Sequence, residues 1–228
     1  MKKLLFIVLF SIVLLFSCSQ KSEIQPAIVE FENADTTFAA NLINYCKFEG
    51  YEPQIYQWKN RVLYFAEKPS QANVIANAVK YAFPDIKYKI YENPFYVFNR
   101  DRCINTQKVE KCDYFIISAI LVENEKMQQE YMDYHATQFE NFPEVSEGFC
   151  KADFQYLNVY RQGRQLMLVI AYPHFADFNE LNSRTVENNP RVDEWNSIMG
   201  KYQEGIDGTD EGEVWVEFKK LRTKSEEL

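Results

Sequence analysis

The chain contains two histidines, and histidine is the side chain that most readily exchanges a proton near neutral pH. His135 lies in the segment EYMDYHATQF, inside a run from 126 to 140 that we expect to be helical. Tyr131 precedes it by four residues, so the phenol and the imidazole share one face of that helix. Taken alone, this spacing is more typical of a hydrogen-bonded core histidine, and a general acid/base beside a hydroxyl group is the alternative. His174 follows a predicted strand in a Tyr-Pro-His-Phe turn, and we interpret it as solvated or structural.

Composition argues against several other kinds of chemistry. The 228 residues include 33 acidic and 25 basic side chains, and the formal net charge of −8 argues against nucleic acid as a partner. No Walker or dinucleotide-binding glycine pattern occurs, and the histidines and cysteines lack zinc-ligand spacing. The acidic segment 207–213 lacks the regular oxygen spacing of an EF-hand, so we interpret it as a solvated loop. We therefore expect no metal and no cofactor.

The N-terminal residues predict where in the cell the protein is located. Lys2 and Lys3 precede an apolar stretch over 4–16, which is too short to span a bilayer and is typical of a signal peptide. The following Leu-Phe-Ser-Cys at 15–18 resembles a bacterial lipobox, so we predict removal of residues 1–17 and lipidation of Cys18. Residues 18–26 would form a tether. The protein is then expected in the bacterial cell envelope, lipid-anchored, on the outer membrane facing the periplasm or the cell surface. An ordinary secretory signal is the alternative.

Four cysteines remain beyond the predicted lipidation site: Cys46, Cys103, Cys112 and Cys150. An even number in an oxidising compartment favours two disulfides. Cys103 and Cys112 bracket a polar segment and could close a local loop, which would leave Cys46 to pair with Cys150. Free buried thiols are the alternative. A catalytic thiol is not expected, because no cysteine has a histidine near it in sequence.

The elements that must position these residues fall into two halves with one plan. Hydrophobic periodicity and turn signals predict the following elements. In the first half they are a strand at 27–31, a helix at 36–48, hairpin strands at 54–58 and 61–67, a helix at 69–82 and an extended segment at 87–99 interrupted by Pro94. In the second half they are a strand at 114–122, a helix at 126–140, hairpin strands at 155–160 and 166–172, a helix at 191–202 and a strand at 214–221.

Both halves have the order β-α-β-β-α-β, so we expect an α+β fold of two tandem ferredoxin-like units packed sheet to sheet. The predicted domains are a first unit at 27–102, a linker loop at 103–112, a second unit at 113–222 and a polar tail at 223–228.

Four segments of the second half together resemble a known family. They are, in chain order, Glu130-Tyr131-x-x-x-His135 followed by Phe139 and Phe142-Pro143-Glu144; Val159-Tyr160-Arg161 with Leu166-Met167-Leu168; Asn189-Pro190-x-Val192-x-Glu194-Trp195-x-x-x-Met199; and Gly212-Glu213-Val214-Trp215-Val216-Glu217-Phe218. In order and spacing they resemble the L-rhamnose mutarotase family over residues 113–221.

The resemblance implies an isomerase that interconverts the anomers of L-rhamnose, L-fucose or a similar monosaccharide. His135 would transfer protons, Tyr131 and Trp195 would bind the sugar, and Phe139 and Trp215 would offer further flat faces. Phe139 stands where the family usually has a tryptophan. The first half has no Tyr-x-x-x-His, so one site is expected in a pseudo-dimer of the dimeric α/β-barrel type, monomeric as a chain. The alternative is a non-catalytic carbohydrate-binding or interaction lipoprotein on the same fold.

Overall fold

The computed structural model describes residues 25–221. The predicted signal peptide, the predicted lipidation site Cys18 and most of the tether lie outside the described residues, as does the polar tail at 223–228. Among the residues described, no helix combines the length and the apolar character needed to cross a membrane.

The first half forms a four-stranded antiparallel sheet with two helices on one face. Its elements are β1 (Ala27–Glu32), α1 (Thr36–Phe48), β2 (Ile55–Trp58), β3 (Arg61–Ala66), α2 (Pro69–Ala82) and β4 (Lys87–Tyr91). Asp35 starts α1 by accepting a hydrogen bond from the Phe38 amide at 2.7 Å, and Pro69 opens α2 at a position where its missing N–H is not needed. The strands lie in the order β4-β1-β3-β2, as in a ferredoxin-like unit.

The second half repeats this order with more helices. Its elements are β6 (Cys112–Leu121), α3 (Glu125–Ala136), α4 (Gln138–Asn141), α5 (Pro143–Lys151), β7 (Tyr156–Gln162), β8 (Gln165–Pro173), α6 (Phe178–Ser183), α7 (Pro190–Met199), the 3-10 turn η2 (Gly200–Tyr202), β9 (Gln203–Glu204) and β10 (Val216–Lys220). Its four main strands lie in the order β10-β6-β8-β7, and β9 pairs with β6. The predicted α+β class with antiparallel sheets is confirmed.

Two predicted helices are shorter than expected. The helix expected at 126–140 ends at Ala136, because Thr137 has a ψ near 0° and turns the chain before α4. Pro143 then opens α5, a helix that the sequence reasoning did not predict. The helix expected at 191–202 ends at Met199 and tightens into η2.

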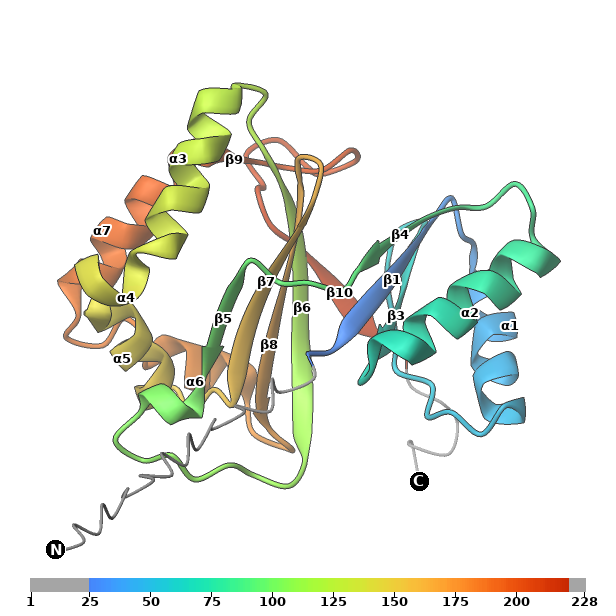
Figure 1. Cartoon of the computed structure of the whole chain (residues 1–228), viewed down its shortest axis with the longest axis horizontal. Helices are drawn as coiled ribbons and strands as arrows, with labels where there is room; N and C mark the ends of the chain where they lie inside the picture. The colour runs from blue at the N-terminus through green and yellow to red at the C-terminus, as the bar shows by residue number, and fades with distance from the viewer. Residues whose placement is uncertain (1–24, 222–228) are drawn as a thin grey trace, which may run out of the picture.

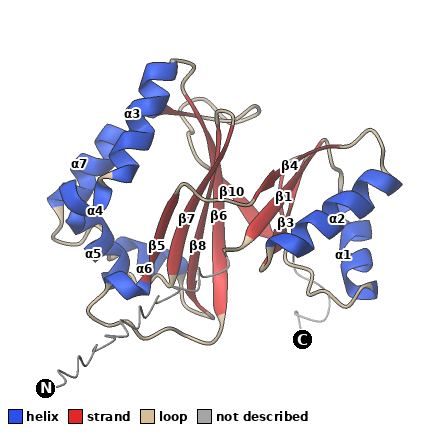
Figure 2. Ribbon diagram, in the orientation of Figure 1, coloured by secondary structure: helices blue, strands red, loops and turns tan. Residues whose placement is uncertain are grey.

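The two halves share one ten-stranded sheet with the order β4-β1-β3-β2-β10-β6-β8-β7-β5. They join at two places: β10 pairs with β2, and β5 (Tyr96–Asn99) pairs with β7. Strand β5 follows β4 in the chain after the break at Pro94, so the end of the first predicted domain lies at the edge of the second half. Figure 1 shows the curled sheet between the two groups of helices, and Figure 2 shows that no helix separates the two halves of the sheet.

The hydrophobic cores follow this layering. One cluster lies between the first half of the sheet and α1 and α2, and two others lie under the helices of the second half. A fourth lies between the two halves and includes Phe65, Tyr91, Tyr160 and Phe218. Because alternate strand residues face opposite sides, each half uses one face for its helices and the other for its partner half.

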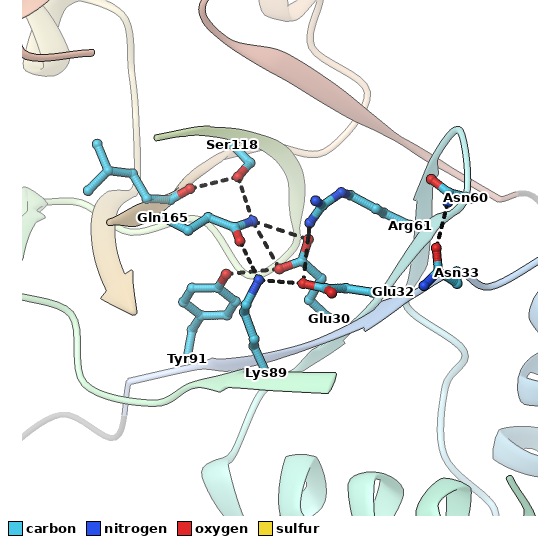
Figure 3. Close-up of polar contacts among 10 residues, drawn as sticks. Glu30, Glu32, Asn33, Asn60, Arg61, Lys89, Tyr91, Ser118 and Gln165 are labelled. Carbon is cyan, nitrogen blue, oxygen red and sulfur yellow. Dashed lines mark hydrogen bonds and ion pairs between the residues drawn. The ribbon is translucent and has the colours of Figure 1, made fainter. Parts of the chain in front are cut away.

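A buried polar cluster also crosses this central core (Figure 3). The side chain of Glu30 on β1 is fully buried and accepts hydrogen bonds from Arg61 at 2.7 Å, from Tyr91 at 2.9 Å and from Gln165 of the second half at 3.0 Å. Gln165 also donates to the Ser118 hydroxyl at 3.1 Å. A buried carboxylate is tolerated when it is paired in this way, so the cluster fixes how the halves meet.

The predicted disulfide pairings are wrong. Cys103 pairs with Cys150, while Cys46 and Cys112 are free. Cys46 belongs to α1 and is buried in the core of the first half, and Cys112 is the first residue of β6, paired with Pro173. The bond instead ties the chain after the 3-10 turn η1 (Arg100–Arg102) to the end of α5.

Candidate functional site

A cavity of about 560 Å³ lies in the second half between the sheet and the helices α3, α5 and α7. Figure 1 shows these helices stacked on the face of β5, β7, β8 and β6. Four of the predicted site residues line the cavity: His135, Tyr131, Trp195 and Trp215. Pockets of this size typically hold small-molecule ligands. The structure therefore brings most of the sequence-predicted site together in one place.

His135 is held in a defined tautomer. Its Nδ1 lies 2.9 Å from the backbone oxygen of Tyr131, and because a carbonyl oxygen can only accept, Nδ1 carries the proton. Among residues 25–221 no group hydrogen-bonds Nε2, so its lone pair is available to a ligand. The side chain is 8% exposed, and this burial lowers the pKa of His135 to about 4, against a small rise caused by the Tyr131 carbonyl. At neutral pH the imidazole is therefore an uncharged base.

Aromatic rings hold this imidazole on several sides. Their centroids lie 4.3 Å away for Tyr131, 5.1 Å for Trp195, 5.3 Å for Tyr96 and 5.5 Å for Phe95. Trp195 comes from α7, whereas Tyr96 and Phe95 come from the segment at and just before β5. The packing fixes the ring plane and excludes bulk water from it.

A chain of hydrogen bonds orients the Tyr131 hydroxyl. Trp215 donates its indole N–H to the Gln203 side-chain oxygen at 3.1 Å, and the Gln203 amide donates to the Tyr131 hydroxyl at 3.3 Å. Burial raises the pKa of Tyr131 well above its usual value, so the phenol stays protonated. Since its oxygen already accepts from Gln203, its own proton is free for a ligand oxygen. The site thus combines a neutral base with a hydroxyl donor.

The structure places Phe139 outside the cavity wall, in contrast to its predicted role. Its ring stacks on Tyr96 with centroids 5.3 Å apart, and the Arg102 guanidinium lies 3.4 Å from the centre of the Phe139 ring. Tyr96 in turn donates a hydrogen bond to Gln138 at 2.6 Å. Phe139 therefore supports the ring that packs on His135 instead of contacting a ligand in the cavity.

His174 is exposed, and its Nδ1 lies 2.9 Å from an Asp113 carboxylate oxygen, remote from the cavity lining. The expectation of a solvated or structural histidine is consistent with this position. Within the described part of the chain, no three His, Cys, Asp or Glu side chains gather closely enough to hold a metal ion.

Sequence reasoning missed Tyr96, Phe95 and Gln203. The two aromatic residues belong to the first half, which lacks the Tyr-x-x-x-His motif, and only the pairing of β5 with β7 brings them to His135. Gln203 follows η2, at a position where no periodicity marks it. The sequence showed that Pro94 interrupts the extended segment at 87–99, but it did not show which strand the residues after Pro94 would pair with.

Comparison with known proteins bears on the same part of the chain. Residues 116–221 match the family model of L-rhamnose mutarotase. A UPF0734 protein of Dictyostelium discoideum is 27% identical over 114 residues, which cover 47% of this chain and 87% of that protein. The resemblance inferred from the sequence motifs is therefore confirmed for the second half.

Two solved structures from Listeria monocytogenes are similar in overall fold. One is an uncharacterised ferredoxin-fold protein related to antibiotic biosynthesis monooxygenases, with 11% identity and a TM-score of 0.42, covering 87% of this chain and 96% of that one. The other is a haem-degrading enzyme, with 10% identity and a TM-score of 0.42, covering 86% of this chain and 100% of that one.

Proposed function

We propose, from the family match over residues 116–221 and the cavity around His135, that this protein interconverts the anomers of a monosaccharide such as L-rhamnose or L-fucose. One observation carries the proposal. The Nδ1 proton of His135 is committed to its own helix, which leaves Nε2 as a base inside a cavity and beside a protonated phenol.

The reaction needs two proton transfers. Nε2 of His135 takes the proton of the anomeric hydroxyl, while the ring oxygen receives a proton from a hydroxyl donor, for which Tyr131 is the candidate. The bond between the anomeric carbon and the ring oxygen breaks, which gives the open-chain aldehyde. The bond between the aldehyde carbon and its neighbouring carbon then rotates. The hydroxyl that carries the former ring oxygen attacks the opposite face of the aldehyde and returns its proton to Tyr131, and the new anomeric hydroxyl takes back the proton held by Nε2 of His135. Positioned acid–base groups typically contribute about 10²–10⁴-fold to such a step.

Each other residue has a part in this scheme. Trp195 offers a flat apolar face for the C–H side of the sugar. Gln203 and Trp215 keep the Tyr131 hydroxyl oriented through their hydrogen bonds. Tyr96 and Phe95 limit the motion of the imidazole.

The same proposal extends to the architecture. Both halves have the ferredoxin-like strand order, and the sheet path leaves the first half at β2 and meets it again at β5. These connections support a tandem pseudo-dimer in which the first half supplies, within one chain, the second sheet that the resemblance implies for homodimeric relatives.

We also propose, from the lipobox-like motif at 15–18, that lipidation of Cys18 anchors the protein in the cell envelope. Loss of membrane fractionation in Cys18→Ala would support this anchor, and unchanged fractionation would contradict it.

The alternative function is sugar binding without catalysis. The observation that favours it is the burial of His135, which has 8% of its surface exposed and is enclosed by four rings. A base that a sugar hydroxyl could not approach closely would leave a binding pocket on the same fold.

Saturation-transfer NMR of anomer exchange separates the two functions. We expect residues 19–228 to accelerate exchange of L-rhamnose or L-fucose, His135→Gln to abolish the acceleration and Tyr131→Phe to reduce it. His174→Gln is the matched control, because that histidine is exposed and outside the cavity lining, and it should retain full activity. Saturable binding without acceleration by the wild type would establish the alternative and refute the isomerase.

A further inference from the structure

The part of the cavity wall that β6, β7 and β8 form is entirely aliphatic. The lining side chains of β6, β7 and β8 are Ile117, Leu157, Val159, Leu168 and Ile170. We call these five residues the cavity floor. None of them has a hydrogen-bonding group in its side chain, so a ligand hydroxyl directed at the floor would lose its hydrogen bonds to water without replacement.

Most polar side chains of the lining are already engaged. The Gln203 amide uses its oxygen for Trp215 and its nitrogen for Tyr131. The Thr185 hydroxyl donates to the backbone oxygen of Asn182 at 2.7 Å, and the Ser183 hydroxyl donates to the backbone oxygen of Glu180 at 2.7 Å.

Among the described residues that line the cavity, three buried side chains keep a polar group without a hydrogen-bond partner: the Nε2 of His135, the hydroxyl proton of Tyr131 and the indole N–H of Trp195. Asn182 and Asn196 also line the cavity, but both are exposed and so lie at its rim. The polar capacity of the interior is therefore concentrated at the imidazole, the phenol and the neighbouring indole of Trp195.

The lining also lacks charge. Among the described residues that form the cavity, none is an Asp, Glu, Lys or Arg. A carboxylate or phosphate buried there would have no ion-pair partner, and an unpaired buried charge is strongly disfavoured. Acidic and phosphorylated sugars are therefore poor ligands for this site.

We propose that the site takes a neutral reducing sugar in which some ring hydroxyl groups are absent or carry an O-methyl group, as in an O-methylated deoxy sugar. This inference rests on the proposed function and names its substrate class. The anomeric end lies at His135 and Tyr131, and the methyl groups lie against the cavity floor. The volume of about 560 Å³ is within the range of about 300–1,000 Å³ that holds ligands larger than a simple monosaccharide.

Competition binding by ligand-observed NMR tests this class without reference to catalysis. The probes are L-rhamnose, 3-O-methyl-L-rhamnose, 2,3-di-O-methyl-L-rhamnose, D-glucuronate and D-glucose 6-phosphate. Because one methyl or methylene group in an apolar pocket typically changes affinity by about 10-fold or more, we expect each methylated sugar to bind at least about 10-fold more tightly than L-rhamnose. The two anionic sugars should not compete.

Substitution of the floor provides the second arm. Leu168→Asn keeps a similar shape but adds an amide, and it should reduce the preference for the methylated sugars by about 10-fold. Leu168→Met stays apolar and should keep that preference, so it separates the added polarity from the change of side chain, and thermal melting of Leu168→Asn checks that this variant is folded. Phe175→Asn makes the same kind of change at a residue 89% exposed and outside the cavity lining, and it should change nothing.

The outcomes separate the inference from the function. Tight binding of methylated sugars without anomer exchange would support the inference and refute the isomerase. Exchange of L-rhamnose without a preference for methylated sugars would support the isomerase and overturn the inference. Competition by the anionic sugars, or binding of none of the probes, would overturn the inference as well.

Discussion

Acid titration of the protein should reveal the buried state of His135. The pKa of about 4 in the folded protein compares with an ordinary value of 6.5. Between these two values the unfolded chain takes up a proton that the folded protein does not, so the free energy of unfolding falls as the pH falls. Above pH 6.5 neither state is protonated, and this histidine makes no pH-dependent contribution.

The size of the effect follows from the two pKa values. At about 1.4 kcal/mol per pH unit, the interval from 6.5 to about 4 corresponds to roughly 3 kcal/mol lost on acidification. His135→Phe keeps a flat ring among the aromatic neighbours but takes up no proton. Between pH 7 and pH 4 its free energy of unfolding should therefore fall by roughly 3 kcal/mol less than that of the wild type.

Two measurements check this reasoning. Urea denaturation at a series of pH values compares the wild type with His135→Phe, and His174→Gln serves as the matched control because His174 is exposed. NMR titration of the two histidine Cε1–H signals gives the pKa directly, with the His174→Gln spectrum assigning the signals. A His135 signal that titrates near 6.5, with parallel pH profiles of stability, would refute the buried neutral imidazole and show a wet cavity.

Three further predictions concern the scaffold of the site. Glu30→Gln should lower the free energy of unfolding by about 3–5 kcal/mol in urea denaturation, because it removes the fully buried carboxylate that pairs with half-buried Arg61 at 2.7 Å. Glu123→Gln, at an exposed ion pair, should change it by less than about 1 kcal/mol, and equal effects of the two substitutions would contradict a linking role for the polar cluster. Gly148→Ala should lower the free energy of unfolding by about 1–3 kcal/mol, because the added Cβ would lie 2.6 Å from the Thr185 backbone oxygen. The matched control is Gly200→Ala, whose Cβ meets nothing within 4 Å and which should be neutral or stabilising in thermal melting. Similar melting temperatures of the two variants would refute the close approach of Gly148 to Thr185. Cys103→Ser should lower the free energy of unfolding in urea by about 2–4 kcal/mol under oxidising conditions and leave it unchanged in the presence of a thiol reductant; an equal loss under both conditions would contradict the Cys103–Cys150 bond.

The sequence predicted the elements with strong local signals. Apolar spacing predicted α1, while Pro69 at the start of α2 and the Asn189-Pro190 pair before α7 mark helix starts that depend on neighbouring residues alone. The grouping of Tyr131 with His135 is equally local, because residues four apart share a helix face. The family motifs then predicted that Trp195 belongs to the same site.

The features that sequence could not predict depend on contacts between distant segments. Cys150 pairs with Cys103 only because α5, a short helix opened by Pro143, brings it there. Gln203 has no local signal, and its role is set by Trp215 twelve residues later and by Tyr131 on another element. The path of β5 depends on the global closure of the sheet, which local patterns do not specify.

The position of β5 has a consequence for how the chain can be divided. Phe95 and Tyr96 lie outside the family-matching residues 116–221, yet both pack on His135. A fragment that begins at residue 113 would lose these rings and leave the backbone groups of β7 unpaired along an open edge, where strands of other molecules can add. Removal of the half without the predicted site histidine would therefore damage the half that has it, and substitutions around Pro94 should change the cavity around His135.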